Sequence, residues 1–274
     1  MIRTLDHAVF PTEALLAAKD RPVSVVLPAR DCADTVGTVV ERIASSRGLV
    51  DQILVVDGGS SDHTVAAAVA AGAQVVAESE LLQDHGPVLG KGDAMWRSLA
   101  AVEGDIVAFV DADTRDFDPR FLNGLLGPLL TDPDLRFVKA TYSRPFTAGG
   151  QDLPGGGGRV SQLMARPLLA AFYPALSALT QPLAGEVAAT RELLESIPFA
   201  TGYAVEMAML LDVYEAAGAA AMAQCDVGER RNHHQPLDAL RPMAEMVLAV
   251  VCRRQGLETA GPEIVTRPPF AETR

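Results

Sequence analysis

Short apolar runs alternate with segments of helical periodicity through the first 110 residues of the chain. The runs have the length of strands and lie at 23–27, 53–56, 74–77 and 106–110. Helices are expected between them, at 34–45, 62–71 and 91–102. Elements that alternate at such short intervals form parallel strands joined by right-handed crossovers. The sequence therefore predicts an α/β fold with a mostly parallel sheet flanked by helices.

The second half of the chain differs from the first in composition and in the elements that it predicts. Residues 149–158 are rich in glycine and predict a loop. Helices are expected at 163–178, 204–217 and 242–253. Residues 1–21 contain no clear strand and predict a short helix or arm, and 262–269 predict a loose tail. The expected organisation is one domain with four regions, namely an arm at 1–21, an α/β region at 22–145, a helix-rich region at 146–254 and a tail at 255–274.

Composition excludes several classes of protein. The chain has 23 Lys and Arg against 35 Asp and Glu, so no nucleic-acid partner is expected, because a phosphate backbone binds a basic surface. Small anionic ligands need only a local cluster of cations and are not excluded. No apolar run approaches the roughly 20 residues of a membrane span, so no membrane association is expected. Cys32, Cys225 and Cys252 form no close pair, which predicts free thiols in a reducing cytoplasm.

Two carboxylates, Asp111 and Asp113, flank Ala112 directly after the expected strand at 106–110. The carboxyl edge of a parallel sheet is where open α/β folds bind ligands. Alternation places both side chains on the same side of the chain, where two charges about 4 Å apart repel by roughly 4 kcal/mol at an effective dielectric of 20. A cation is therefore expected beside them, and a divalent ion that holds a diphosphate fits. The alternative is a pair that only caps a helix or lies in solvent.

Three further segments lie where a ligand at this edge would be. Residues 28–31 follow the first strand, and residues 57–62 follow the second with two glycines that allow a close approach of backbone to ligand. Lys91 lies between two glycines at a helix N-terminus, which favours anions, but no P-loop pattern surrounds it. Each segment alone could be a simple strand-to-helix turn. Together with Asp111 and Asp113, Lys91 predicts a diphosphate clamp.

The second half offers three more polar clusters. Arg159 follows four glycines and suits a carboxylate or phosphate, with Arg144 and Arg166 as further members; the alternative is a linker. Glu206 lies in the first turn of an expected helix, where it could orient a hydroxyl group or only complement the helix dipole. Residues 230–234, Arg-Arg-Asn-His-His, could bind phosphate or a metal ion, or could form an exposed basic loop.

In this order, the segments resemble the retaining glucosyl-3-phosphoglycerate synthases of actinobacteria, which are GT-A glycosyltransferases. The resemblance runs from about residue 23 to residue 254. The motifs that carry it are VVLPA at 25–29, GKG at 90–92, MWRSL at 95–99, DAD at 111–113, GGRV at 157–160, ARPLL at 165–169, QPLAGE at 181–186, AATR at 188–191, PFA at 198–200, and GY at 202–203 with Glu206. It implies a GT-A fold, Rossmann-like, in which residues 22–145 bind the nucleotide sugar and 146–254 form the helix-rich acceptor region.

The resemblance also implies ligands and roles. The donor would be a nucleotide-diphosphate-glucose such as UDP-glucose, the acceptor D-3-phosphoglycerate, the cofactor Mg²⁺ or Mn²⁺, and the assembly a cytoplasmic homodimer. The implied catalytic residues are Lys91, Asp113 and Glu206, and the implied metal ligands are Asp113 and His233. The implied donor-binding residues are Pro28, Ala29, Arg30, Cys32, Gly58, Lys91, Asp111, Ala112, Asp113, Arg230 and Arg231. The implied acceptor-binding residues are Gly158, Arg159, Ser161, Tyr203 and His234.

The chain departs from the family pattern at three places. The family usually has an acidic residue at the position of Cys32 and a serine at that of Gly58, both on the donor side. Its metal loop reads Arg-x-His-x-Asn, and an ungapped match places Asn232 on the metal-binding histidine. A slide of one residue gives Arg231-Asn232-His233 and makes His233 the expected ligand, which leaves His234 for the acceptor.

The expected reaction is transfer with retention, in which Lys91 and the metal neutralise the departing diphosphate. The resemblance implies a front-face route, in which an oxygen of the departing phosphate helps to remove the acceptor proton. The alternative mechanism is double displacement through Glu206 or Glu186. Alternative functions are a related transferase with another donor or hydroxy-acid acceptor, a nucleotidyltransferase, and a nucleotide-sugar-binding protein without activity. The segment at 28–32 argues against a nucleotidyltransferase, whose first strand leads into a basic glycine-rich loop.

Overall fold

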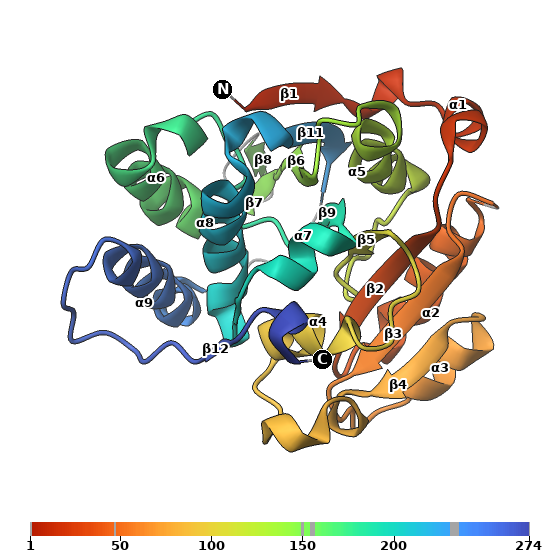
Figure 1. Cartoon of the computed structure of the whole chain (residues 1–274), viewed down its shortest axis with the longest axis horizontal. Helices are drawn as coiled ribbons and strands as arrows, with labels where there is room; N and C mark the ends of the chain where they lie inside the picture. The colour runs from red at the N-terminus through yellow and green to blue at the C-terminus, as the bar shows by residue number, and fades with distance from the viewer. Residues whose placement is uncertain (1, 47, 149–150, 154–156, 231–235, 274) are drawn as a thin grey trace.

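The computed structural model describes residues 2–46, 48–148, 151–153, 157–230 and 236–273 (Figure 1). An eight-stranded sheet forms its centre, with the order β1-β11-β6-β9-β5-β2-β3-β4. Among these strands only β9 runs antiparallel to its neighbours, β5 and β6. The strands are β1 (Arg3–Asp6), β2 (Val23–Ala29), β3 (Gln52–Asp57), β4 (Gln74–Ala77), β5 (Ile106–Phe109), β6 (Phe137–Ser143), β9 (Val187–Thr190) and β11 (Met222–Glu229). The predicted mostly parallel sheet is confirmed.

Helices cover both faces of the sheet (Figure 1). Alternation along β2 divides the core, because Val25 and Leu27 pack with one buried cluster and Val26 packs with the other. The first cluster includes residues of α2 and α5, and the second includes residues of α4, α8 and α9. The helices are α1 (Thr12–Ala18), α2 (Ala33–Ala44), α3 (Thr64–Ala70), α4 (Lys91–Ser98), α5 (Pro119–Thr131), α6 (Arg166–Phe172), α7 (Arg191–Ser196), α8 (Val205–Ala217) and α9 (Leu237–Arg254).

The two ends of the chain differ from expectation. Residues 1–21 contain a strand, β1, which pairs in parallel with β11, and the expectation of no strand there is wrong. Its residues are mostly exposed, so it has the composition of an edge strand and no apolar run. The expected loose tail at 262–269 is also wrong, since β12 (Thr266–Arg267) pairs with β10 (Phe199–Ala200) and Phe270 is buried.

Several element boundaries shift for identifiable reasons. The first strand continues through Pro28 to Ala29, because Pro28 lies beyond Val26, the last residue of β2 that pairs with β5. The helix expected at 163–178 is divided into a π-helical turn at Ser161–Ala165, α6 and a 3₁₀ turn at Pro174–Leu176. Proline at position 174 cannot continue the hydrogen-bond ladder of α6.

The three cysteines are free, as predicted. Within the ranges given above, the structure contains no helix that is both long and apolar enough to cross a membrane.

Candidate active site

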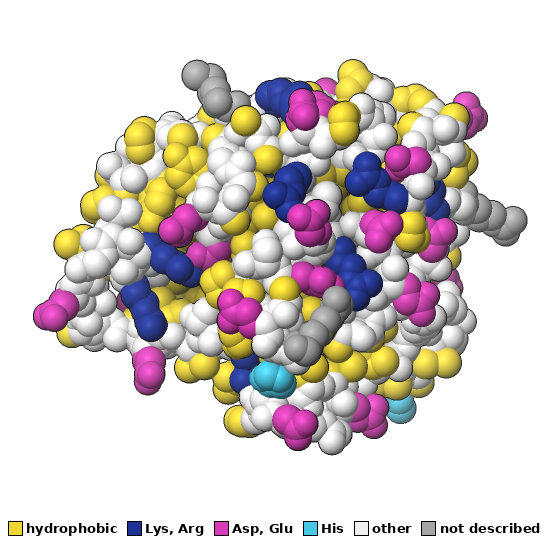
Figure 2. Space-filling model, viewed as in Figure 1, with side chains coloured by type: hydrophobic (Ala, Val, Ile, Leu, Met, Phe, Trp, Pro, Cys, Tyr) yellow, Lys and Arg dark blue, Asp and Glu magenta, His cyan; other side chains and the backbone are white. Residues whose placement is uncertain are grey.

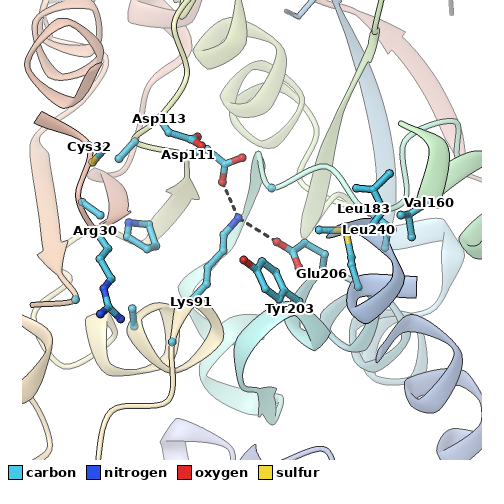
Figure 3. A pocket seen from close by; sticks show the side chains of 18 of the residues that line it. Arg30, Cys32, Lys91, Asp111, Asp113, Val160, Leu183, Tyr203, Glu206 and Leu240 are labelled. Carbon is cyan, nitrogen blue, oxygen red and sulfur yellow. Dashed lines mark hydrogen bonds and ion pairs between the residues drawn. The ribbon is translucent and has the colours of Figure 1, made fainter. Parts of the chain in front are cut away.

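A cavity of about 550 Å³ opens at the carboxyl ends of β2, β3 and β5. Its walls come from the segments that follow these strands, from the N-termini of α4 and α8, from residues 157–161 and from α9. The parallel strands bring these segments to one edge of the sheet, where the sequence predicts the ligand site. In Figure 3, Arg30 and Cys32 lie on one side of Lys91, and Val160, Leu183 and Leu240 lie on the other.

The structure gathers nearly all of the residues singled out from the sequence around this cavity. Arg230 does not line it but lies directly behind it, in contact with Asp111. Arg231, Asn232, His233 and His234 lie outside the described residues. Those that line the cavity are Pro28, Ala29, Arg30, Cys32, Gly58, Lys91, Asp111, Ala112, Asp113, Gly158, Arg159, Ser161, Tyr203 and Glu206.

Lys91 is fixed at the centre of the cavity by two carboxylates. Its Nζ lies 2.6 Å from Asp111 Oδ1 and 3.0 Å from Glu206 Oε1 (Figure 3). Burial opposes the charge on Lys91, but Asp111 and Glu206 outweigh it and raise the pKa of the amine well above its ordinary value. Lys91 is therefore a fixed ammonium group that joins the strand edge to the N-terminus of α8.

The glycines around Lys91 serve packing. A Cβ at Gly92 would lie 2.0 Å from the carbonyl oxygen of Ala200, so α4 can approach β10 only without a side chain at this position. Gly90, with φ of 84°, is the residue before the first turn of α4. The flanking glycines thus let the helix bring Lys91 against its two carboxylates.

Asp111 and Asp113 have different environments. The Asp111 side chain is 20% exposed and accepts hydrogen bonds from Lys91 at 2.6 Å and from Arg230 Nη2 at 3.2 Å. Burial alone would raise the pKa of Asp111, but these two cations hold it well below its usual range. The Asp113 side chain is 76% exposed and lies 4.0 Å from Arg230. Lys91 and Arg230 therefore supply the positive charge that was expected beside the two carboxylates. Both bind Asp111, and Asp113 is left facing the cavity.

Arg230 and Glu186 belong to a buried polar network behind the cavity, together with Tyr142 and Thr114, which no pattern in the sequence indicated. Arg230 is 1% exposed and contacts the fully buried carboxylate of Glu186; it also donates to Tyr142 Oη at 3.1 Å and to Thr114 Oγ1 at 3.0 Å. Tyr142 in turn donates to Glu186 at 2.9 Å. At Arg230, the alternative of an exposed basic loop is therefore wrong. Glu186 is no candidate nucleophile, because Arg230 and Tyr142 hold it away from the cavity.

Lys139 is a second buried cation near the cavity. It is buried, and its Nζ donates to the carbonyl oxygen of Ala184 at 2.7 Å. Burial lowers the pKa of Lys139 to about 8, against the opposing effect of Glu206 and Glu186. The neighbouring position 185 has room only for glycine, because a Cβ there would lie 2.4 Å from Asp111 Oδ1 and 2.7 Å from Lys91 Nζ. The only signal in the sequence was a lone lysine within the apolar run at 137–142.

The turns on the donor side are held by their own acidic residues. Asp57 accepts from the backbone N–H of Gly59 and Ser60 at 3.2 Å, and Asp31, at φ of 49°, accepts from the N–H of Ser61 at 2.7 Å. Asp62 accepts from Thr64 N at 2.9 Å, near the start of α3. These aspartates shape the loops, which agrees with the turn interpretation of residues 57–62. Cys32 and Gly58 line the cavity beside them.

The opposite side combines arginines with an apolar wall. Arg144 and Arg159 both line the cavity, and Arg144 donates to Tyr142 Oη at 2.9 Å. Arg166, the third expected member, instead donates to Gln162 and is not among the lining residues. Three side chains of α9, which no sequence motif indicated, complete the wall: Leu240, Met243 and Val247.

The donor set at Asp113 fits a hard divalent cation. Carboxylate oxygen suits Mg²⁺ and Mn²⁺, which commonly bind through one or two carboxylates together with substrate phosphates and water. Asp111 is occupied by Lys91 and Arg230, so Asp113 is the carboxylate of the pair that could take a metal. Outside residues 231–235 and the other short gaps, no three side chains of His, Cys, Asp or Glu come together as a metal cluster.

Comparison with known proteins gives close relatives. Residues 24–148 match the model of glycosyl transferase family 2. The glucosyl-3-phosphoglycerate synthase of Mycolicibacterium smegmatis is 49% identical over 249 residues, covering 90% of this chain and 82% of that protein. The mannosyl-3-phosphoglycerate synthase of Rubrobacter xylanophilus has a TM-score of 0.91 at 43% identity, covering 99% of this chain and 96% of that one. The glucosyl-3-phosphoglycerate synthase of Mycobacterium tuberculosis, in complex with Mn²⁺, UDP-glucose and phosphoglyceric acid, has a TM-score of 0.90 at 41% identity. The match covers 100% of this chain and 99% of that one.

Proposed function

The chain belongs to the glucosyl-3-phosphoglycerate synthase family of glycosyltransferases, and we propose that it transfers glucose from UDP-glucose to the 2-hydroxyl of D-3-phosphoglycerate with retention at the anomeric carbon. The observation that carries the proposal is the position of Lys91. Its ammonium lies between Asp111 on the strand edge and Glu206 on the opposite wall, where a diphosphate and an acceptor would meet. The Mycobacterium tuberculosis relative holds UDP-glucose, Mn²⁺ and phosphoglyceric acid together.

Lys91 has the charge and place to neutralise the leaving diphosphate. Negative charge develops on that group as the glycosidic bond breaks, and a cation already fixed in position stabilises it without reorganisation. Lys91 opens α4, whose N-terminal N–H groups also favour an anion. Its two carboxylates hold it in place, so Lys91 needs no movement before the chemical step.

Asp113 would hold a divalent cation, Mn²⁺ or Mg²⁺, together with diphosphate oxygens, and His233 is the proposed second protein ligand. When bound, such an ion acts as a Lewis acid toward the leaving diphosphate. Cys32, Gly58 and the residues at 28–30 are proposed to contact the nucleoside part of the donor. Arg230 acts from behind, where it keeps Asp111 ionised.

The acceptor side matches a small molecule with two anionic groups. D-3-phosphoglycerate carries a carboxylate and a phosphate, and guanidinium groups bind both in bidentate fashion. Arg159 is the proposed main partner, with Gly158, Ser161, Tyr203 and His234 as further contacts. Glu206 would orient the transferred sugar or the acceptor hydroxyl from its fixed position beside Lys91.

Glu186 is buried and cannot reach the donor, so Glu206 is the remaining candidate nucleophile for a double displacement. We propose the front-face route instead, because Glu206 is engaged by Lys91 at 3.0 Å. Trapping of a glucosyl adduct on Glu206 with a slow fluorinated donor would contradict this route.

The direct test is a reaction of the purified protein with UDP-glucose, D-3-phosphoglycerate and Mn²⁺. We expect UDP release and a product whose NMR coupling constant shows an α-glucosyl linkage. Asp113→Ala should lose turnover and its dependence on Mn²⁺. Pyrophosphate-dependent turnover would instead indicate a nucleotidyltransferase, and tight donor binding without transfer would indicate a binding protein.

The similarity to a mannosyl-3-phosphoglycerate synthase makes mannose transfer the second candidate. The same reaction is therefore run with UDP-, GDP- and ADP-linked glucose and with GDP-mannose. A higher kcat/KM for the mannose donor would replace glucose by mannose in the proposal and would leave the acceptor unchanged.

We also propose that the protein works in the cytoplasm as a homodimer. Figure 2 shows hydrophobic side chains gathered over α6, and Leu163 and Phe172 in this region are 74% and 39% exposed. Exposed apolar patches of this kind favour association. Light scattering behind a sizing column should give twice the chain mass, and a monomer at micromolar concentration would contradict the proposal.

A further inference from the structure

Glu78 is a buried carboxylate that the transfer chemistry does not use. It lies at the end of β4, in the 3₁₀ turn Glu78–Glu80, is 3% exposed and lines the cavity on the donor side. No hydrogen bond or ion pair joins its carboxylate to another described residue, and Oε1 is buried without a partner. A buried polar group without a partner is costly and requires an explanation, of which a ligand is one.

The surroundings of Glu78 leave a space in front of it. Gly58, at the start of the turn after β3, has no side chain, and a Cβ there would lie 3.5 Å from Glu78 Oε2. Pro28, Ala29, Val56 and Val88 add apolar surface to the same cavity. A flat, partly apolar group with a hydrogen-bond donor at its edge would fit such a site.

We propose that the Glu78 carboxylate accepts hydrogen bonds from the N–H edge of the donor's nucleobase, and that it selects uracil or guanine over adenine. This rests on the proposed function only in taking the cavity as a nucleotide-sugar site. Uracil offers one N–H between two carbonyl groups, whereas guanine offers two adjacent N–H donors that match both carboxylate oxygens. Adenine presents an acceptor nitrogen at the corresponding place, which a carboxylate repels.

The electrostatic environment of Glu78 agrees with a binding site for a hydrogen-bond donor. Burial, together with Asp93, raises the pKa of Glu78 to about 7, while Arg97, Arg267 and Arg30 oppose this rise. A bound N–H donor would favour the ionised form and return the pKa toward its ordinary value.

The test is calorimetric binding of UDP, GDP and ADP to the wild type, Glu78→Met and the control Glu80→Met. Glu80 is exposed and lies in the same turn, so it controls for loss of charge. In Glu78→Met we expect UDP and GDP to bind about ten- to a hundredfold more weakly, the range for a hydrogen bond to a charged group, and ADP to bind as tightly as before or more tightly, because the repulsion of its acceptor nitrogen is removed. Glu78→Gln, which keeps one acceptor oxygen, should lose less for UDP than for GDP.

Unchanged affinity of Glu78→Met for all three nucleotides would overturn the proposal, as would an equal loss for all three. Thermal melting of each variant checks the fold, and removal of an unpartnered carboxylate should leave the melting temperature equal or higher. If the wild type binds no nucleotide at all, the proposed function fails. Nucleotide binding without selection at Glu78 refutes only this inference.

Discussion

At the scale of single residues, the chemistry of the site depends on which carboxylate is paired with a cation of the chain. Asp111 and Asp113 are alike in sequence, yet Lys91 and Arg230 bind the first and leave the second at the cavity surface. Arg230 is 119 positions from Asp111 in the chain, so no local pattern could assign it to that carboxylate. Local sequence predicted that both aspartates lie at the strand edge, and packing decided their different environments.

Replacement of Lys91 by Met should reduce kcat by about 10²–10³, as for other enzymes that lose one fixed electrostatic partner of the transition state. The variant also leaves Asp111 and Glu206 without the cation between them. Steady-state kinetics measures the loss. Lys19→Met is the matched control, because Lys19 pairs with Asp51 at 2.6 Å and does not line the cavity, and it should retain full activity. An activity of Lys91→Met within threefold of the wild type would contradict the role of Lys91.

The raised pKa of Glu78 predicts a dependence of stability on pH. Its pKa is about 7 in the folded state against 4.5 in the unfolded chain, so between these values the unfolded state releases a proton that the folded state keeps. Stability then falls as pH rises from about 4.5 to 7, by roughly 2–3 kcal/mol from this group. Urea unfolding should show Glu78→Gln equal to the wild type near pH 4.5 and more stable at pH 8. A constant difference across this range would contradict the shift.

At the scale of elements, short glycine-mediated contacts bring the catalytic helix into place. α4 carries Lys91 and meets β10 through Gly92, and the segment at Gly185 passes directly over Lys91 and Asp111. The helix and the strands around it were predictable from periodicity. The reason for these glycines was not, because it lies in neighbours that are distant in sequence.

Gly92→Ala should destabilise the protein by more than about 2 kcal/mol, since its Cβ would lie 2.0 Å from the backbone oxygen of Ala200. Gly37→Ala in α2 is the matched control. Its Cβ would lie 3.6 Å from the nearest atom, an ordinary contact, so the higher helix propensity of Ala should stabilise by up to about 1 kcal/mol. Denaturant midpoints of the two variants should therefore move in opposite directions, and a shift in the same direction would refute the packing argument.

At the scale of the whole molecule, the C-terminal segment closes the structure around α4. Arg267 of β12 binds the fully buried Asp93 at 2.7 Å, and Trp96 Nε1 donates to the carbonyl oxygen of Pro268 at 2.8 Å. Asp93 follows Lys91 by two residues, so the last part of the chain supports the helix of the active site. The expectation of a loose tail failed because a two-residue strand has no periodicity to detect.

Arg267→Met should cost about 2–4 kcal/mol of stability, because it leaves Asp93 buried with Arg97 as its remaining cation. Arg253→Met is the control for the same segment, since Arg253 contributes one hydrogen bond to the carbonyl oxygen of Ile264 and should cost less than about 1 kcal/mol. Equal effects of the two substitutions in thermal and urea unfolding would show that the Asp93 pair is not important.

The sequence by itself determined the alternation of strands and helices, the parallel sheet and the edge at which Lys91, Asp111 and Asp113 meet. These follow from local periodicity and from the rule that parallel strands share a carboxyl edge. Only the tertiary structure decided that β1 and β12 exist, that Arg230 and Glu186 pair behind the cavity, and that Glu78 faces it without a partner. Burial and ion pairing depend on segments far apart in the chain, and an edge strand or a lone buried charge leaves no repeating pattern in the sequence.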